Sequence, residues 1–144
     1  MDKFTNLSTK NYIYLLIITG LIVYALTLLN GFVWDDIIQI VNNNAVHSPM
    51  NTPNFFLGLS YSSASNTTTE FPYYRPMFLT ILSIIYSMFS TTAFFYHLVQ
   101  LSVHIANAVL LFLLFKNFFK STLSFLLSTI FLVHPINTEA VVYV

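Results

Sequence analysis

Two long apolar stretches without a charged side chain constrain the fold of this sequence more than any other feature. One runs from Asn11 to Leu29 and the other from Phe94 to Phe115. At a helical rise of ~1.5 Å per residue the stretches cover about 28 to 33 Å, which matches the ~30 Å hydrocarbon core of a bilayer. A cleavable signal peptide is the rival interpretation of the first stretch, but such peptides have shorter apolar regions, roughly 7–15 residues. Both stretches are therefore predicted to be membrane-spanning helices.

The composition excludes most soluble alternatives. Apolar and aromatic residues make up 56% of the chain and charged residues only 7%, whereas soluble domains carry about 25% charged residues. The formal net charge of zero gives no basic surface for nucleic acid. The absence of cysteine removes disulfides, thiolate catalysis and cysteine-based zinc sites. The predicted fold class is all-α, a multi-span transmembrane helical protein.

The rest of the chain is divided by its polar segments. Residues 30–93 form a long loop rich in Asn, Ser and Thr, in which the apolar run 77–89 is too short to span and is expected to be interfacial or re-entrant. A third span is expected over 117–133. We therefore expect residues 1–144 to be a partial transmembrane domain, truncated at its C-terminal end inside an apolar stretch.

The lysines predict the orientation. Lys3 and Lys10 precede the first span, and Lys116 and Lys120 follow the second. Cytoplasmic loops are enriched in lysine and arginine. If 77–89 lies at the outer interface, both lysine pairs are cytoplasmic; if it crosses, the second pair is outside. The first arrangement is favoured, and it makes 30–93 an external loop.

Three acidic residues are candidates for catalysis. Asp35 and Asp36 directly follow the first span, and adjacent carboxylates raise each other's proton affinity, which suits a general base or a cation ligand. The alternative is a solvated pair that caps a loop helix. Glu139 follows a helix break at Pro135, where it is a candidate second acid and His134 a proton carrier or ligand. In the favoured orientation these acids share the non-cytoplasmic face, although an ordinary polar turn also explains the segment 134–139.

Arg75 is the only basic residue of the long loop and follows Tyr74. A guanidinium group matches phosphate oxygens in bidentate fashion. The alternative is simple anchoring to lipid headgroups.

Four polar residues lie on one face of the second span, at spacings of three, four and three: His97, Gln100, His104 and Asn107. Polar groups inside a span either line a cavity or form hydrogen bonds between helices. The spacing leaves both interpretations open.

Four motifs follow one another along the chain: Phe32-Val33-Trp34-Asp35-Asp36, Tyr74-Arg75-Pro76, Tyr96-His97-Leu98-Val99 with His104 and Asn107, and His134-Pro135-Ile136-Asn137-Thr138-Glu139-Ala140-Val141. In this order they resemble the N-terminal part of the GT-C membrane glycosyltransferases. The nearest resemblance is to the transmembrane and tetratricopeptide-repeat O-mannosyltransferases and their bacterial relatives, and it extends from about Gly31 to Val144.

The resemblance implies transfer of a sugar, expected to be mannose, from a polyprenyl-phosphate carrier to a protein hydroxyl on the non-cytoplasmic side. Asp35 or Asp36 then matches the base that acts on the acceptor, and Glu139 the second acid. Arg75, with Tyr74 beside it, matches the residue that contacts the carrier phosphate. The lipid-linked sugar is the donor, no further cofactor is implied with certainty, and a divalent cation is compatible with the acidic residues.

The resemblance is incomplete, and this keeps other functions open. Gln100 stands where the relatives often have Asn, and the relatives continue through many more spans. A chain of two or three spans is not expected to be active alone, so the main alternative is a non-catalytic membrane anchor or accessory subunit with a larger membrane partner. A small channel built on the polar stripe is a third interpretation. A eukaryotic source would place the protein in the endoplasmic reticulum and a bacterial one in the plasma membrane.

Overall fold

The structure, a computed structural model, describes residues 7–59 and 74–144, and these residues form helices joined by turns and loops. Lys3, one of the lysines that predict orientation, lies outside them. The chain divides into two compact units, one made of Met1–Asn30 with His97–Val144 and the other of Gly31–Tyr96. Within the described part no strand is present, which confirms the all-α prediction.

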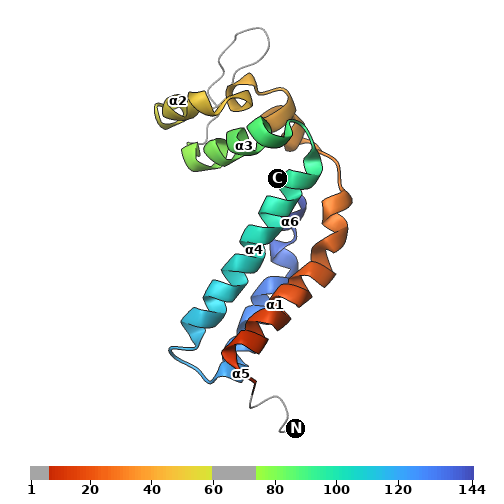
Figure 1. The fold of residues 1–144 in the computed structure, drawn as a ribbon, viewed down its shortest axis with the longest axis vertical. Coiled ribbons are helices and arrows are strands. Elements are labelled where there is room, and N and C mark those ends of the chain that lie inside the picture. Colours follow the sequence, from red (N-terminus) through yellow and green to blue (C-terminus); the bar gives the residue numbers. More distant parts are fainter. Residues whose placement is uncertain (1–6, 60–73) are drawn as a thin grey trace. The chain divides into compact units, whose positions relative to one another are not determined.

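The first unit is a bundle of long apolar helices (Figure 1). Helix α1 (Thr9–Tyr24) continues as the 3-10 helix η2 (Ala25–Leu29), and both this combined helix and α4 (Ala93–Phe115) are long and apolar enough to cross a bilayer. Helix α5 (Ser121–Val133) passes the same test only together with the segment that follows it, across a bend of 49°. That segment contains η6 (Pro135–Asn137) and α6 (Glu139–Val142).

Helix α5 begins at Ser121, later than the start expected at Asn117. Residues 116–119 form a turn instead, in which the N–H groups of Lys116 and Phe119 close on the carbonyls at the end of α4. Lys116 also donates from Nζ to the hydroxyl of Thr9 near the start of α1. The turn thus lets α5 run back beside α1.

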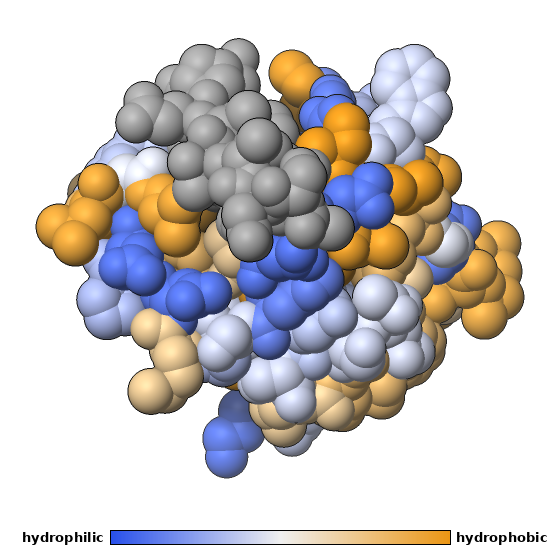
Figure 2. All heavy atoms as spheres, turned by 90° about the horizontal axis from the view of Figure 1, so that it is seen from above, coloured by the Kyte–Doolittle hydropathy of each residue, from blue (hydrophilic) through white to orange (hydrophobic). Residues whose placement is uncertain are grey.

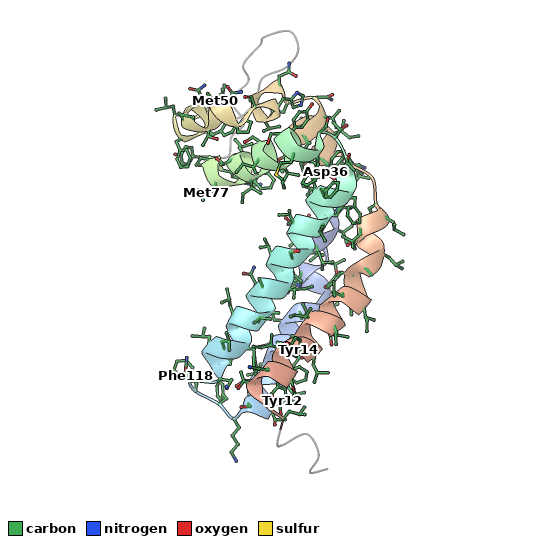
Figure 3. All side chains as sticks on the ribbon, in the orientation of Figure 1. Tyr12, Tyr14, Asp36, Met50, Met77 and Phe118 are labelled. Atoms are coloured by element: carbon green, nitrogen blue, oxygen red, sulfur yellow. The ribbon has the colours of Figure 1, made fainter. Side chains whose placement is uncertain are left out.

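Helix α1 packs through one face with a four-residue spacing, formed by Tyr12, Leu16, Gly20 and Tyr24. A Cβ atom at Gly20 would lie 2.7 Å from Cγ1 of Ile105 in α4, so glycine is what permits the close approach of the two helices. The core also contains Leu101, Ala108 and Phe112 of α4, Leu132 of α5 and Val141 of α6. Tyr14, two residues after Tyr12, is exposed (Figure 3).

The second unit contains short helices that precede α3 (Pro76–Phe89). The 3-10 helices η4 (Asn44–His47) and η5 (Pro49–Asn51) and the helix α2 (Thr52–Phe56) pack on α3, and the π-helix η3 (Ile37–Val41) packs on η4. The rings of His47 and Tyr86 stack with centroids 3.9 Å apart. The Nε2 atom of His47 lies 2.9 Å from the carbonyl oxygen of Ile40 and must carry a proton there, because a carbonyl only accepts.

Helix α3 is apolar on both faces but short, at 14 residues or about 21 Å. One face is buried within the unit and includes Leu82 and Ser83. The other leaves Met77, Ile81, Ile84 and Met88 exposed at helical spacing. Met77 and Met50 lie on the outside of the unit (Figure 3), and Figure 2 shows polar and apolar side chains interspersed on the face seen from above.

Candidate functional site

The two adjacent aspartates have different environments in the structure. The carboxylate of Asp36 is buried and its Oδ2 accepts a hydrogen bond of 3.1 Å from the N–H of Val33. The N–H of Asp36 returns a bond of 3.0 Å to the carbonyl of Val33, so the two residues close a tight turn. Asp35 is exposed, and its carboxylate has no hydrogen bond or ion pair with the described residues. Asp36 therefore shapes the turn, and Asp35 is the one of the two carboxylates that is accessible from outside the unit.

Trp34 is held in a strained conformation by the same turn. Its φ is +46°, a region that a bulky residue rarely adopts. The indole is 86% exposed, so packing within the described residues does not compensate for the strain. Backbone strain of this kind gathers at functional sites, where the surrounding structure enforces it. The strained residue directly precedes the accessible carboxylate of Asp35.

Arg75 lies at the N-terminal end of α3, in the same unit as the aspartates. It is the N-cap residue, and its side chain makes no capping bond to α3, which begins at Pro76. The first N–H groups of a helix have no partner within it and carry a partial positive charge. Tyr74, the residue before Arg75, is held by a hydrogen bond of 3.0 Å from its hydroxyl to the carbonyl of Phe56. A cationic side chain and a helix N-terminus together suit an anionic ligand.

The helix break after α5 is stabilised by side chains from three helices or turns. Pro135 has no N–H, so carbonyls at the end of α5 lose their usual partners. The carbonyl of Leu132 accepts hydrogen bonds from Tyr24 of α1 (3.1 Å) and His104 of α4 (3.0 Å). The carbonyl of Phe131 accepts one of 2.7 Å from the side-chain amide of Asn137. His104 therefore has an interhelical bond, and its Nε2 carries the proton.

Gln100 connects α4 to the segment that carries Glu139. Its Nε2 donates a hydrogen bond of 2.6 Å to the carbonyl of Ala140. Glu139 is exposed and is the first residue of α6. His134 is also exposed, and its Nδ1 accepts a bond of 3.2 Å from the N–H of Ile136. The polar stripe of α4 thus reaches the helix break that holds the second candidate acid.

The other two residues of the stripe, His97 and Asn107, differ in burial. His97 is fully buried, and neither ring nitrogen has a hydrogen-bond partner among the described residues. Asn107 lines an open hollow of about 370 Å³ together with Leu110, Leu111 and Leu114 of α4 and Phe131 of α5.

The candidate site residues therefore form two sets. The unit Gly31–Tyr96 contains Asp35, Asp36, Tyr74 and Arg75. The other unit contains His97, Gln100, His104, Asn107, His134 and Glu139. Among residues 7–59 and 74–144, no three His, Asp or Glu side chains group as metal ligands, and a divalent cation stays a prediction.

Sequence reasoning gave no role to Tyr24 or Asn137. An aromatic residue in an apolar stretch gives no signal of a bond to another helix. Asn137 had one signal, because a polar side chain two residues after a proline can reach the carbonyls that the proline leaves free.

Comparison with known proteins supports the resemblance drawn from the motifs. The chain is 28% identical over 111 residues to human protein O-mannosyl-transferase TMTC3, which is 77% of this chain and 12% of the relative. It is 30% identical over 122 residues to human protein O-mannosyl-transferase TMTC1, which is 82% of this chain and 14% of the relative. It is 33% identical over 124 residues to mouse TMTC1, which is 82% of this chain and 13% of the relative.

The chain thus spans about an eighth of the length of the relatives it matches. No protein-family model and no solved structure matches it. The resemblance to the transmembrane O-mannosyltransferases is confirmed, and with the apolar helices it identifies a membrane protein.

Proposed function

We propose that this chain supplies the acceptor-activating and phosphate-binding residues of a GT-C type membrane glycosyltransferase. The reaction is transfer of mannose from a polyprenyl-phosphate carrier to a protein hydroxyl on the non-cytoplasmic side. The relatives named as protein O-mannosyl-transferases support the reaction class. The observation that carries the assignment of residues is the division between an accessible, unpaired Asp35 and a buried, hydrogen-bonded Asp36.

Asp35 is the general base of this proposal. Its carboxylate removes the proton of the acceptor hydroxyl while the hydroxyl oxygen attacks the anomeric carbon of the sugar. A carbon–oxygen bond forms to the acceptor, the bond from the anomeric carbon to the phosphate oxygen breaks, and polyprenyl phosphate leaves. Asp36 positions the base, because its bond to the N–H of Val33 fixes the turn that contains Asp35.

Arg75 stabilises the leaving phosphate in this proposal. Negative charge grows on the phosphate as the glycosidic bond breaks, and a fixed cation that binds it more tightly in the transition state accelerates the reaction. The N–H groups at the start of α3 add to the attraction. The hydrogen bond from Tyr74 to Phe56 restricts the backbone that precedes Arg75.

Glu139 is the second acid, and Gln100 restrains its segment through Ala140. The two candidate acids then share the non-cytoplasmic side, as the lysine distribution predicts. The membrane is that of the endoplasmic reticulum in a eukaryotic cell and the plasma membrane in a bacterium. A larger membrane partner would complete the site if the chain serves as an accessory subunit.

The test is mannose transfer in membranes that contain the chain, with a mannosyl-phosphoryl polyprenol donor and a serine- and threonine-containing peptide. We expect Asp35→Asn to lower turnover by about 10²- to 10⁴-fold, the usual contribution of a general base, with unchanged protein level. Arg75→Lys keeps the charge but loses the bidentate geometry and should lower turnover less than Arg75→Ala. Tyr14→Phe, at an exposed position on α1, is the matched control that should leave the rate unchanged.

Full transfer by Asp35→Asn would remove Asp35 from the reaction. Transfer that is absent from the wild-type chain but appears with a co-expressed membrane protein, and is insensitive to Asp35→Asn, would favour the accessory subunit.

A further inference from the structure

The exposed face of α4 contains an unpaired amide near the middle of a predicted span. Asn107 is exposed and makes no hydrogen bond to the described residues. It lies three residues from the centre of the helix Ala93–Phe115, about 4.5 Å along the axis. Hydrocarbon offers no hydrogen-bond partner, so a side-chain amide at this depth normally bonds to another helix.

The residues around Asn107 form a continuous seam, which we define as Val103, Asn107, Leu110 and Leu114. Their spacings of four, three and four are those of the a and d positions of a heptad repeat. Val103 is 52%, Leu110 62% and Leu114 51% exposed. Along the length of the seam, α4 packs in the bundle through Leu101, Ile105, Ala108 and Phe112, which lie on the opposite side of the helix, and His104 lies between the two faces. The seam is therefore separate from the face that packs in the bundle.

The seam borders a hollow of about 370 Å³, which Phe131 of α5 completes. Packing of paired helices inserts a side chain of one helix into a hole on the other. The hollow beside Asn107, Leu110 and Leu114 provides such a hole, with apolar walls and one polar group.

We propose that the seam of α4 is the contact between two copies of this chain in the membrane. A carboxamide carries both a donor and an acceptor, so two Asn107 side chains related by a two-fold axis satisfy each other. An asparagine at a single a position specifies paired helices in a fixed register. The seam holds no charged residue that would oppose the approach of an identical helix. This inference does not depend on the proposed catalytic activity.

Disulfide crosslinking tests the geometry directly, because the natural chain has no cysteine. Single cysteines replace seam residues (Val103→Cys, Leu110→Cys, Leu114→Cys) in the full chain reconstituted in phosphatidylcholine vesicles and oxidised. Equal residues meet across a two-fold axis, so each seam variant should form a covalent dimer. Ser102→Cys and Leu113→Cys are controls at the same depths, each about 100° around the helix from its seam neighbour, and should stay monomeric.

Energy transfer between labelled copies in the same vesicles measures the strength of association. We expect Asn107→Leu to raise the dissociation constant about 3- to 30-fold, the range for one hydrogen bond between membrane helices. Ser102→Ala is the control: it also removes an exposed polar group from α4, but the Ser102 hydroxyl already bonds the carbonyl of Leu98. A chain that stays monomeric, or crosslinks equally at seam and control positions, would overturn the proposal.

Discussion

The imidazole of His104 donates a hydrogen bond of 3.0 Å from Nε2 to the backbone carbonyl of Leu132. The bond joins the middle of α4 to the end of α5. In a continuing helix the carbonyl of Leu132 would accept from the N–H of Ile136, which instead bonds Nδ1 of His134. Tyr24 bonds the same carbonyl from α1. His104, a polar residue inside a span, thus forms one of the two interhelical bonds to a carbonyl that the helix break exposes.

Removing both donors to Leu132 should destabilise the bundle more than the separate losses predict. We expect His104→Leu and Tyr24→Phe each to lower the free energy of unfolding by about 0.6–1.7 kcal/mol, the measured range for such bonds in membranes. The double variant should lose more than the sum, because the carbonyl then has no side-chain partner. Thermal unfolding in detergent measures this. Ser128→Ala, which removes a buried hydroxyl that has no partner among the described residues, is the matched control and should cause no loss.

Gly20→Ala should loosen the packing of α1 on α4. The added Cβ would lie 2.7 Å from Cγ1 of Ile105, which we expect to lower stability by about 1–3 kcal/mol. Ile105→Ala removes the opposing atoms, so it should lower the free energy of unfolding less in the Gly20→Ala background than in the wild-type chain. A double-mutant cycle measures the coupling. Gly31→Ala is the control, with no atom within 4 Å of its added Cβ; purely additive effects would contradict the close contact.

The two aspartates should respond differently to removal of the carboxylate. Asp36→Ala leaves the N–H of Val33 without its acceptor, and we expect a loss of about 1–3 kcal/mol in the free energy of unfolding. Asp35→Ala removes an exposed group without a partner and should change stability by less than about 0.5 kcal/mol. Thermal unfolding of the two purified variants measures both effects. Equal destabilisation would contradict the division of roles between the two residues.

Replacing Trp34 should test the strain in its backbone. Glycine adopts positive φ without steric penalty, so Trp34→Gly should raise the unfolding free energy by about 0.5–1 kcal/mol. Trp34→Ala removes the same indole but keeps the Cβ, and should give no gain. Chemical denaturation in detergent distinguishes the two variants. An alanine variant as stable as the glycine variant would show that the side chain, and not φ, determines the effect.

The long helices were predictable because each follows from a local property of the sequence, but the short helices η3, η4, η5 and α2 had no predicted bounds. The uncharged lengths of Asn11–Leu29 and Phe94–Phe115 indicated long helices, and Pro135 indicated the break. The short apolar run 77–89 also forms a helix, α3.

The contacts of the polar residues were not predictable from the sequence. Spacing placed His104 and Asn107 on one face but could not distinguish a bond to a neighbouring helix from an open position, because that depends on which helix packs there. Likewise, two adjacent aspartates are equivalent in sequence, and only the turn at Val33 buries Asp36 and leaves Asp35 exposed.

The bend between α5 and α6 also determines what can move. A proline break is often a hinge, but here side chains of α1, α4 and the turn itself hold both of its sides. These hydrogen bonds therefore fix the position of the segment that carries Glu139 once the bundle has folded. Under the proposed function, Glu139 would need little reorganisation when the substrate binds, and we expect any opening that admits the lipid-linked sugar to occur in another part of the protein.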